Sequence, residues 1–166
     1  MTARRYSADL QAQFAASTDA RQLLAWTLGW LAASLRFKGG SIARLRGDEL
    51  EIVAAFGQID DVARRVRLRR GEGIAGAVAA TGRAIYNPDL DLPSQTATAA
   101  SRTVGTNRLI RSYLCAPLTS AGKVIGVMQI DSGRPNAFAP EDVGLFESVA
   151  AALSDSDALR SWRTDR

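Results

Sequence analysis

The hydrophobic periodicity of this chain changes twice, and those changes restrict its fold more than any single motif does. Leucines spaced i, i+4, i+7 and i+11 form one helical face near the N-terminus, at Leu24, Leu28, Leu31 and Leu35. Beyond Gly39-Gly40 apolar residues alternate with period two, as in strands, and helical spacing returns after Pro140. The sequence therefore predicts terminal helices with a β-sheet between them.

The N-terminal half is predicted to contain two helices and then three strands, over residues 4–15, 20–36, 41–46, 50–56 and 65–69. Ser17-Thr18-Asp19 supplies N-cap candidates for the second helix, and Gly47-Asp48 is the turn of a β-hairpin. The second strand is expected to place four apolar side chains on one face: Leu50, Ile52, Ala54 and Phe56. In the third strand arginines alternate with apolar residues, which is typical of an antiparallel strand with one solvated face.

The C-terminal half is predicted to contain a short helix and three strands, over residues 74–80, 84–86, 113–118 and 124–130, and then a helix that begins at Pro140. Gly82 is expected to end the short helix, because glycine tolerates the left-handed backbone of that position. Residues 87–107 are polar, and loops of this length are usually functional or mobile. Ser154-Asp155-Ser156-Asp157 interrupts the apolar face of the last helix and indicates a break or a partner surface.

Helices at both ends and an antiparallel sheet between them define an α+β fold, with the helices grouped against one face of the sheet. The chain has 166 residues, of which 46% are hydrophobic, which suits one domain with a core of its own. The formal charge of +4 is mild, and its arginines fit a solvated strand face better than a nucleic-acid site.

The composition excludes several kinds of chemistry. The chain has no histidine and a single cysteine, Cys115, which rules out a Ser-His-Asp triad, a Cys-His dyad, the usual zinc sites and any internal disulfide. We therefore expect no metal and no catalytic residues. No signal peptide or membrane-crossing apolar run is visible, and we expect a cytoplasmic protein without a membrane partner.

Gly71, Gly73 and Gly76 have the GxGxxG spacing of a dinucleotide-binding turn, with Asp89 in place of a ribose-binding acid. That turn needs a buried parallel strand before the glycines and a long helix after them. Here the preceding strand is charged at alternate positions and the following helix is short, so a dinucleotide site is not expected. Gly71 and Gly73 would instead allow a tight turn, and Gly76 a close approach of the helix to the sheet.

A series of motifs carries a family resemblance when their order and spacing are taken together. These are GEGIAG at residues 71–76, Asn87-Pro88-Asp89, RSYLCAPL at 111–118, VIGV at 124–127 and Phe138-x-Pro140-Glu141-Asp142. The chain resembles the GAF domain over residues 18–153, with residues 1–17 and 154–166 as helical extensions. The resemblance implies a profilin-like, six-stranded antiparallel sheet with terminal helices on one face and a small-molecule pocket on the other, under a variable loop.

The resemblance also implies where a ligand would bind. In cyclic-nucleotide-binding GAF domains the residues that match Ile74 and Ala75 contact the ligand phosphate, and Thr106 lies near a ligand-contacting threonine. Ile110 and Gln129 depart from that pattern, so a cyclic nucleotide is one candidate and the ligand stays open. The expected ligand-binding residues are Phe56, Ile74, Ala75, Tyr86, Asp89, Thr103, Thr106, Arg108 and Gln129.

Two branches of the family carry chemistry that can be compared with this sequence. Phytochrome-type GAF domains attach a bilin through a cysteine beside a histidine, and the chain has no histidine. The free methionine sulfoxide reductases resemble it at residues 126–132, but their chemistry uses two cysteines and Cys115 is alone. The prediction is therefore that the chain is not an enzyme and has no bilin or haem attachment site.

Two functional hypotheses remain. The first is a sensor, in which a small ligand bound under residues 87–107 shifts the packing of the terminal helices in a homodimer. The second is a ligand-free scaffold that acts by dimerisation or by binding a partner protein. Either module would act on an effector domain or a partner protein. The dimer interface is expected to include Trp26, Trp30, Leu153 and Trp162, from the apolar area on the terminal helices.

Overall fold

The computed structural model describes residues 3–37, 39–57, 65, 67–91 and 110–164. In its N-terminal half the elements are α1 (Ala3–Ala16), α2 (Ala20–Leu35), β1 (Gly39–Arg46), β2 (Glu49–Phe56) and β3 (Arg67–Arg69). They are followed by α4 (Gly73–Thr81), β4 (Ile85–Asn87), β5 (Ser112–Ser120), β6 (Lys123–Ser132), α6 (Pro140–Asp155), the 3-10 turn η1 (Asp157–Leu159) and α7 (Arg160–Thr164).

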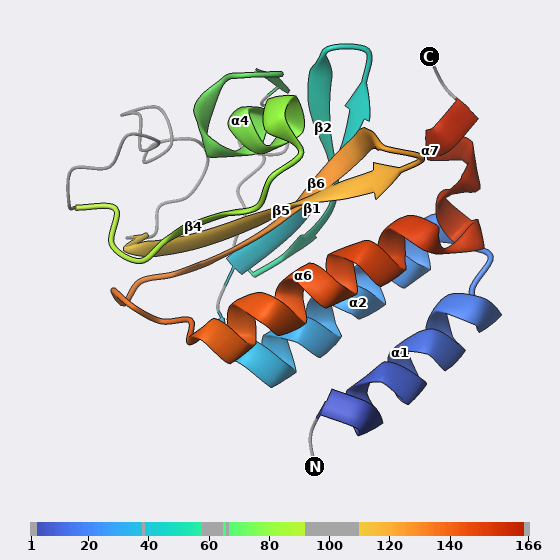
Figure 1. Cartoon of the computed structure of the whole chain (residues 1–166), viewed down its shortest axis with the longest axis horizontal. Coiled ribbons are helices and arrows are strands. Elements are labelled where there is room, and N and C mark those ends of the chain that lie inside the picture. Colours follow the sequence, from blue (N-terminus) through green and yellow to red (C-terminus); the bar gives the residue numbers. More distant parts are fainter. Residues whose placement is uncertain (1–2, 38, 58–64, 66, 92–109, 165–166) are drawn as a thin grey trace.

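The six strands form one antiparallel sheet in the order β3-β2-β1-β6-β5-β4. Helices α1, α2 and α6 lie on one face of the sheet, and α4 lies on the other (Figure 1). We call these the helix face and the α4 face. This arrangement confirms the predicted α+β class, the sheet and the grouping of the terminal helices on one face.

The helix-face core is built from the predicted stripe of α2. Leu24, Leu28 and Leu31 are almost completely buried, together with Phe146 of α6 and Met128 of β6. Asp19 caps α2 as predicted, because its carboxylate accepts a hydrogen bond from the Gln22 backbone N–H at 3.1 Å. Helix α1 lies outside α6 and adds its own apolar side chains to the same core (Figure 1).

A β-bulge in β2 corrects the predicted face of that strand. Ile42 pairs with Ala54 while the next residue of β1, Ala43, pairs with Ile52, so Val53 is the extra residue. Because of this extra residue, the side chains after the bulge alternate between the two faces of the sheet in the opposite order to those before it. Leu50 and Ile52 pack on the α4 face, whereas Ala54 and Phe56 belong to the helix-face core.

The last helical segment is broken where the polar residues predicted a break. Helix α6 ends at Asp155, and the chain turns through η1 into α7. The Ser154 hydroxyl accepts a hydrogen bond from the Thr119 backbone N–H at 2.9 Å, and it donates one to the Ala150 carbonyl at 2.7 Å. In the described ranges, no helix is both long and apolar enough to span a membrane.

Candidate ligand site on the α4 face

The glycine-rich turn brings α4 onto the sheet. Gly71 and Gly73 have φ angles of 92° and 62°, in the left-handed region that favours glycine. The Gly71 N–H donates to the Gly76 carbonyl at 2.7 Å, which closes the turn. A Cβ on Gly76 would lie 2.4 Å from the Arg69 carbonyl oxygen, so only glycine fits there. The structural role predicted for these glycines is confirmed.

Beneath α4 the sheet presents two adjacent rows of side chains. In the first row Ser41, Gln129 and Cys115 are neighbours across β1, β6 and β5. In the second row Asp131, Tyr113 and Asn87 are neighbours across β6, β5 and β4. We call Ser41, Asn87, Tyr113, Gln129 and Asp131 the polar cluster. It interrupts a face that is otherwise covered by the apolar α4-side core.

Hydrogen bonds orient three members of the polar cluster. The Tyr113 hydroxyl donates to Oε1 of Gln129, and Nε2 of Gln129 donates to Oγ of Ser41 at 2.6 Å. Both ends of the Gln129 amide are therefore fixed by partners on the neighbouring strands. A preorganised polar surface of this kind can recognise the hydrogen-bonding pattern of a ligand.

Asn87 supplies a donor without a partner. Its side chain is only 4% exposed, and its Oδ1 accepts a hydrogen bond from the Asp89 backbone N–H at 3.1 Å. In the described part of the chain, Nδ2 of Asn87 is buried and has no hydrogen-bond partner. A buried unpaired amide N–H is costly, so a ligand acceptor at this position would recover the lost hydrogen bond.

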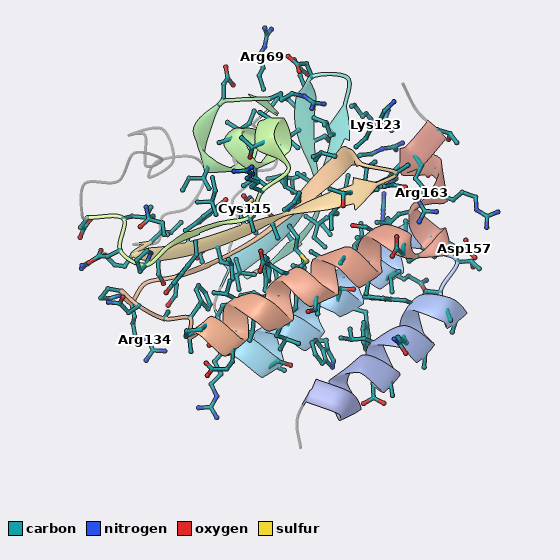
Figure 2. All side chains as sticks on the ribbon, in the orientation of Figure 1. Arg69, Cys115, Lys123, Arg134, Asp157 and Arg163 are labelled. Carbon is teal, nitrogen blue, oxygen red and sulfur yellow. The ribbon has the colours of Figure 1, made fainter. Side chains whose placement is uncertain are left out.

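Burial also sets the charge states on this face. It raises the pKa of Tyr113 well above its ordinary value, and the negative charge of the Asp131 carboxylate raises it further. Tyr113 therefore stays protonated at neutral pH and remains a donor. Burial likewise raises the pKa of the Cys115 thiol, which lies in the middle of the sheet (Figure 2).

An ion-pair cluster lies where the chain enters and leaves residues 92–109. The Arg111 guanidinium donates to both carboxylate oxygens of Asp89, at 2.9 and 2.8 Å, and its Nε lies 2.9 Å from a carboxylate oxygen of Asp91. The hydrogen bond to Asp89 raises the pKa of Arg111. The Leu90 N–H donates to the Arg111 carbonyl at 2.6 Å, so backbone and side chains hold the two ends together.

The predicted ligand-site residues that the structure describes lie on both faces of the sheet. Gln129 is in the polar cluster, Asp89 is in the ion-pair cluster at its edge, and the side chains of Ile74 and Ala75 are buried in the α4-side core. Phe56 and Tyr86 lie on the opposite, helix face. The roles of Ile74, Ala75, Asp89 and Gln129 in binding stay predictions.

The prediction that Phe56 and Tyr86 lie in the ligand site is thus corrected by the geometry of their strands. The bulge in β2 turns Phe56 against Phe37, with ring centroids 5.7 Å apart. The pairing of Tyr86 with Leu114 turns its ring against Phe138, at 6.2 Å. The remaining expected residues, Thr103, Thr106 and Arg108, lie outside the described residues.

Four members of the polar cluster, Ser41, Asn87, Tyr113 and Asp131, were not predicted as site residues. The four come from separate strands. Two of them lie in motifs of the family resemblance, Asn87 in Asn87-Pro88-Asp89 and Tyr113 in RSYLCAPL. The others become visible as a group only through the strand order.

The residues expected at a dimer interface also fall into two groups, one partly exposed and one buried. Trp26 and Trp30 are partly exposed on α2, and their rings stack at 6.4 Å. Leu153 is 0% exposed and Trp162 is 6% exposed, because both pack into the core of their own chain. The prediction that Leu153 and Trp162 face a second subunit is therefore wrong for this fold.

The comparison with known proteins identifies the class to which this fold belongs. The GAF domain family model matches residues 19–156, and the chain belongs to the GAF family. It is 32% identical over 150 residues to the Nif-specific regulatory protein of Azospirillum lipoferum. That match covers 86% of this chain and 24% of the relative, so the chain spans about a quarter of the length of that protein.

Solved structures share the fold. The GAF domain of an Acinetobacter phosphoenolpyruvate-protein phosphotransferase matches with a TM-score of 0.82 at 16% identity, covering 100% of this chain and 99% of that one. The free methionine-R-sulfoxide reductase of Neisseria meningitidis, solved with its substrate, matches with a TM-score of 0.76 at 24% identity, covering 92% and 86%.

The second of these structures corrects a prediction. We expected from the single cysteine that the chain is not an enzyme, and the reductase shows that enzymes are built on this same fold. The fold is therefore compatible with catalysis, and the exclusion of enzyme function was wrong. The GAF family, to which the chain belongs, is a regulatory and sensory family of domains.

Proposed function

We propose that this GAF domain is a sensory module that binds a small polar ligand on the α4 face of its sheet. The observation that carries the proposal is the buried, unpaired Nδ2 of Asn87 within the polar cluster. Its neighbours supply the complementary groups, because Tyr113 presents a hydroxyl and Asp131 a carboxylate. A ligand that offers a hydrogen-bond acceptor to Asn87 fits this set.

The ligand would lie between α4 and the polar cluster, and the proposal extends the prediction that residues 87–107 close over it. The ion pairs of Arg111 with Asp89 and Asp91 support this placement, since they hold both ends of that segment beside the cluster. Binding would then order the site and bias the packing of the domain. Cyclic nucleotides, nucleobases and small carboxylic acids are the first compounds to examine.

The test is a thermal-shift screen of those three compound classes with wild type and with Asn87→Asp. A ligand that binds only the folded state raises the melting temperature. Asn87→Asp keeps the Oδ1 acceptor for the Asp89 N–H and removes the Nδ2 donor. We expect a stabilising compound to bind the variant at least about tenfold more weakly, which corresponds to about 1.4 kcal/mol.

Gln11→Glu is the matched control, because it makes the same amide-to-carboxylate change at an exposed residue of α1, on the helix face of the sheet (Figure 1). Its affinity should equal that of wild type. If no compound in the three classes raises the melting temperature, or if Asn87→Asp binds as tightly as wild type, the ligand site is not the one proposed.

We also propose that the domain acts as a homodimer through the α2 surface that carries Trp26 and Trp30. This proposal is supported by the stacked indoles of the two tryptophans, which are partly exposed. Exposed apolar surface of this size favours burial against a second subunit. Such a dimer would pass a change of helix packing to an effector domain or partner protein. The regulatory relative, of which the chain spans 24%, is consistent with that role.

Trp26→Lys should convert the dimer to monomers, as measured by light scattering, because a lysine in an apolar interface loses its hydration. Ala80→Lys adds the same charge on the exposed surface of α4, across the sheet, and should leave the mass unchanged. A wild-type mass equal to one chain, or a dimer that survives Trp26→Lys, would show that this surface does not associate.

A further inference from the structure

A cavity of about 350 Å³ lies at the opposite end of the sheet from the polar cluster. The turn between β1 and β2 contributes Gly47 to its wall, the turn between β5 and β6 contributes Ser120 and Ala121, and α7 contributes Trp162. Arg70, from the turn before α4, completes the lining, so the cavity is bordered by four segments that are distant in the sequence. Figure 2 shows Lys123 and Arg163 at this end, beside α7, and Arg134 at the other end.

The charged side chains that line this cavity all have one sign. Arg70, Lys123 and Arg163 line it, and the described lining residues include no aspartate or glutamate. Arg70 is compensated by Asp48, whose carboxylate lies 3.3 Å from its Nε. Lys123 is exposed and has no ion-pair partner among the described residues. The cavity consequently carries a net positive potential that attracts anions.

The Arg163 guanidinium is held in place by backbone carbonyls. It donates to the carbonyls of Ser154 and Ser156, at 2.7 and 2.8 Å, near the C-terminal end of α6. Its Nε is buried and has no partner in the described part of the chain. A cation fixed in this way is suited to an anionic ligand group, because little ordering entropy is lost on binding.

Apart from Ser120, the rest of the lining is apolar and includes a flat ring. Leu45, Val124 and Ile125 face the cavity together with Trp162. The Trp162 ring is itself positioned by Arg44, whose guanidinium carbon lies 5.5 Å from the ring centroid. A ligand here therefore meets a cationic rim and an apolar wall at once.

We propose that this cavity binds a small amphipathic anion, that is, a phosphate or carboxylate group attached to a flat apolar body. The anionic group would pair with Lys123 and Arg163, and the apolar body would pack against Trp162 and Ile125. This site goes beyond the proposed function, because it shares no residue with the polar cluster. A bound anion would join α7 to the two hairpin turns and restrain their relative motion.

The probe for this site is phenyl phosphate, with inorganic phosphate as the probe that lacks the apolar body. Titrated into the full chain and followed by two-dimensional NMR, phenyl phosphate should shift the indole N–H signal of Trp162 saturably, and those of Trp26 and Trp30 should stay in place. Lys123→Glu should weaken binding at least about tenfold, since an attractive charge becomes a repulsive one. Inorganic phosphate should bind more weakly than phenyl phosphate.

Arg134→Glu is the charge-matched control, because Arg134 is exposed and lies at the opposite end of the molecule (Figure 2). It should bind phenyl phosphate as wild type does. The proposal is overturned if phenyl phosphate leaves the Trp162 signal unmoved, if Lys123→Glu binds as well as wild type, or if Arg134→Glu weakens binding equally. If inorganic phosphate bound as tightly as phenyl phosphate, the apolar wall would not contribute to binding, and the proposal of an amphipathic ligand would be overturned.

Discussion

Replacing Gly76 by alanine should destabilise the domain by about 3 kcal/mol or more, at the upper end of what an overpacked site costs. A Cβ at this position would lie 2.4 Å from the Arg69 carbonyl oxygen and 3.1 Å from backbone atoms of Gly71. Both neighbours are main chain and cannot rotate away as a side chain could. Relief requires moving α4 and breaking the 2.7 Å hydrogen bond from the Gly71 N–H to the Gly76 carbonyl.

Gly144→Ala is the matched control, because it adds the same methyl group to an exposed helical position with no atom within 4 Å of the new Cβ. That variant should gain about 0.5–1 kcal/mol from helix propensity alone. Urea denaturation followed by circular dichroism measures both changes. Equal stability of Gly76→Ala and wild type would mean that α4 does not approach the sheet as closely as described.

Truncating Trp162 to alanine should cost about 3–5 kcal/mol, the usual range for a buried large aromatic side chain. Its ring is 6% exposed, is contacted by Arg44 and covers Gly126, where a Cβ would lie 3.1 Å from the ring. No smaller side chain can fill that space. The loss should also free α7, which would appear as faster amide exchange at Arg160–Thr164.

Trp26→Ala provides the comparison within the same residue type. Its ring is partly exposed, so its removal should cost clearly less stability than removal of Trp162. If Trp162 were instead an interface residue, its truncation would lower the mass of the assembly and leave the stability of the chain nearly unchanged. Denaturation and light scattering on the same two variants distinguish these results.

The fold could be predicted because most of its elements are encoded locally. Neighbouring residues are enough to predict the apolar stripe of α2 and its cap at Asp19. The same holds for the glycine that ends α4 and the proline that begins α6. The β2 bulge could not be predicted, because Val53 is an ordinary strand residue and the extra position is set by pairing with β1. One unpredicted residue was enough to move Phe56 to the other face.

The candidate site was less predictable because its geometry depends on contacts between distant segments. Gln129 was expected at the site, but its partners Ser41 and Tyr113 are assigned only once β1, β6 and β5 are neighbours in that order. Trp162 was assigned to an interface because its apolar ring extends the helix pattern. The turn at Ser156 folds it back onto β1 and β6, a long-range event that periodicity does not record.

The anchoring of Arg111 by Asp89 and Asp91 has a consequence for how domains of this kind diversify. With both ends of residues 92–109 fastened to the sheet, the closure entropy of that segment grows only with the logarithm of its length. Insertions and wholesale replacements there should thus cost the scaffold little. Sequence changes can then accumulate in a single segment while strand register and helix packing are inherited unchanged.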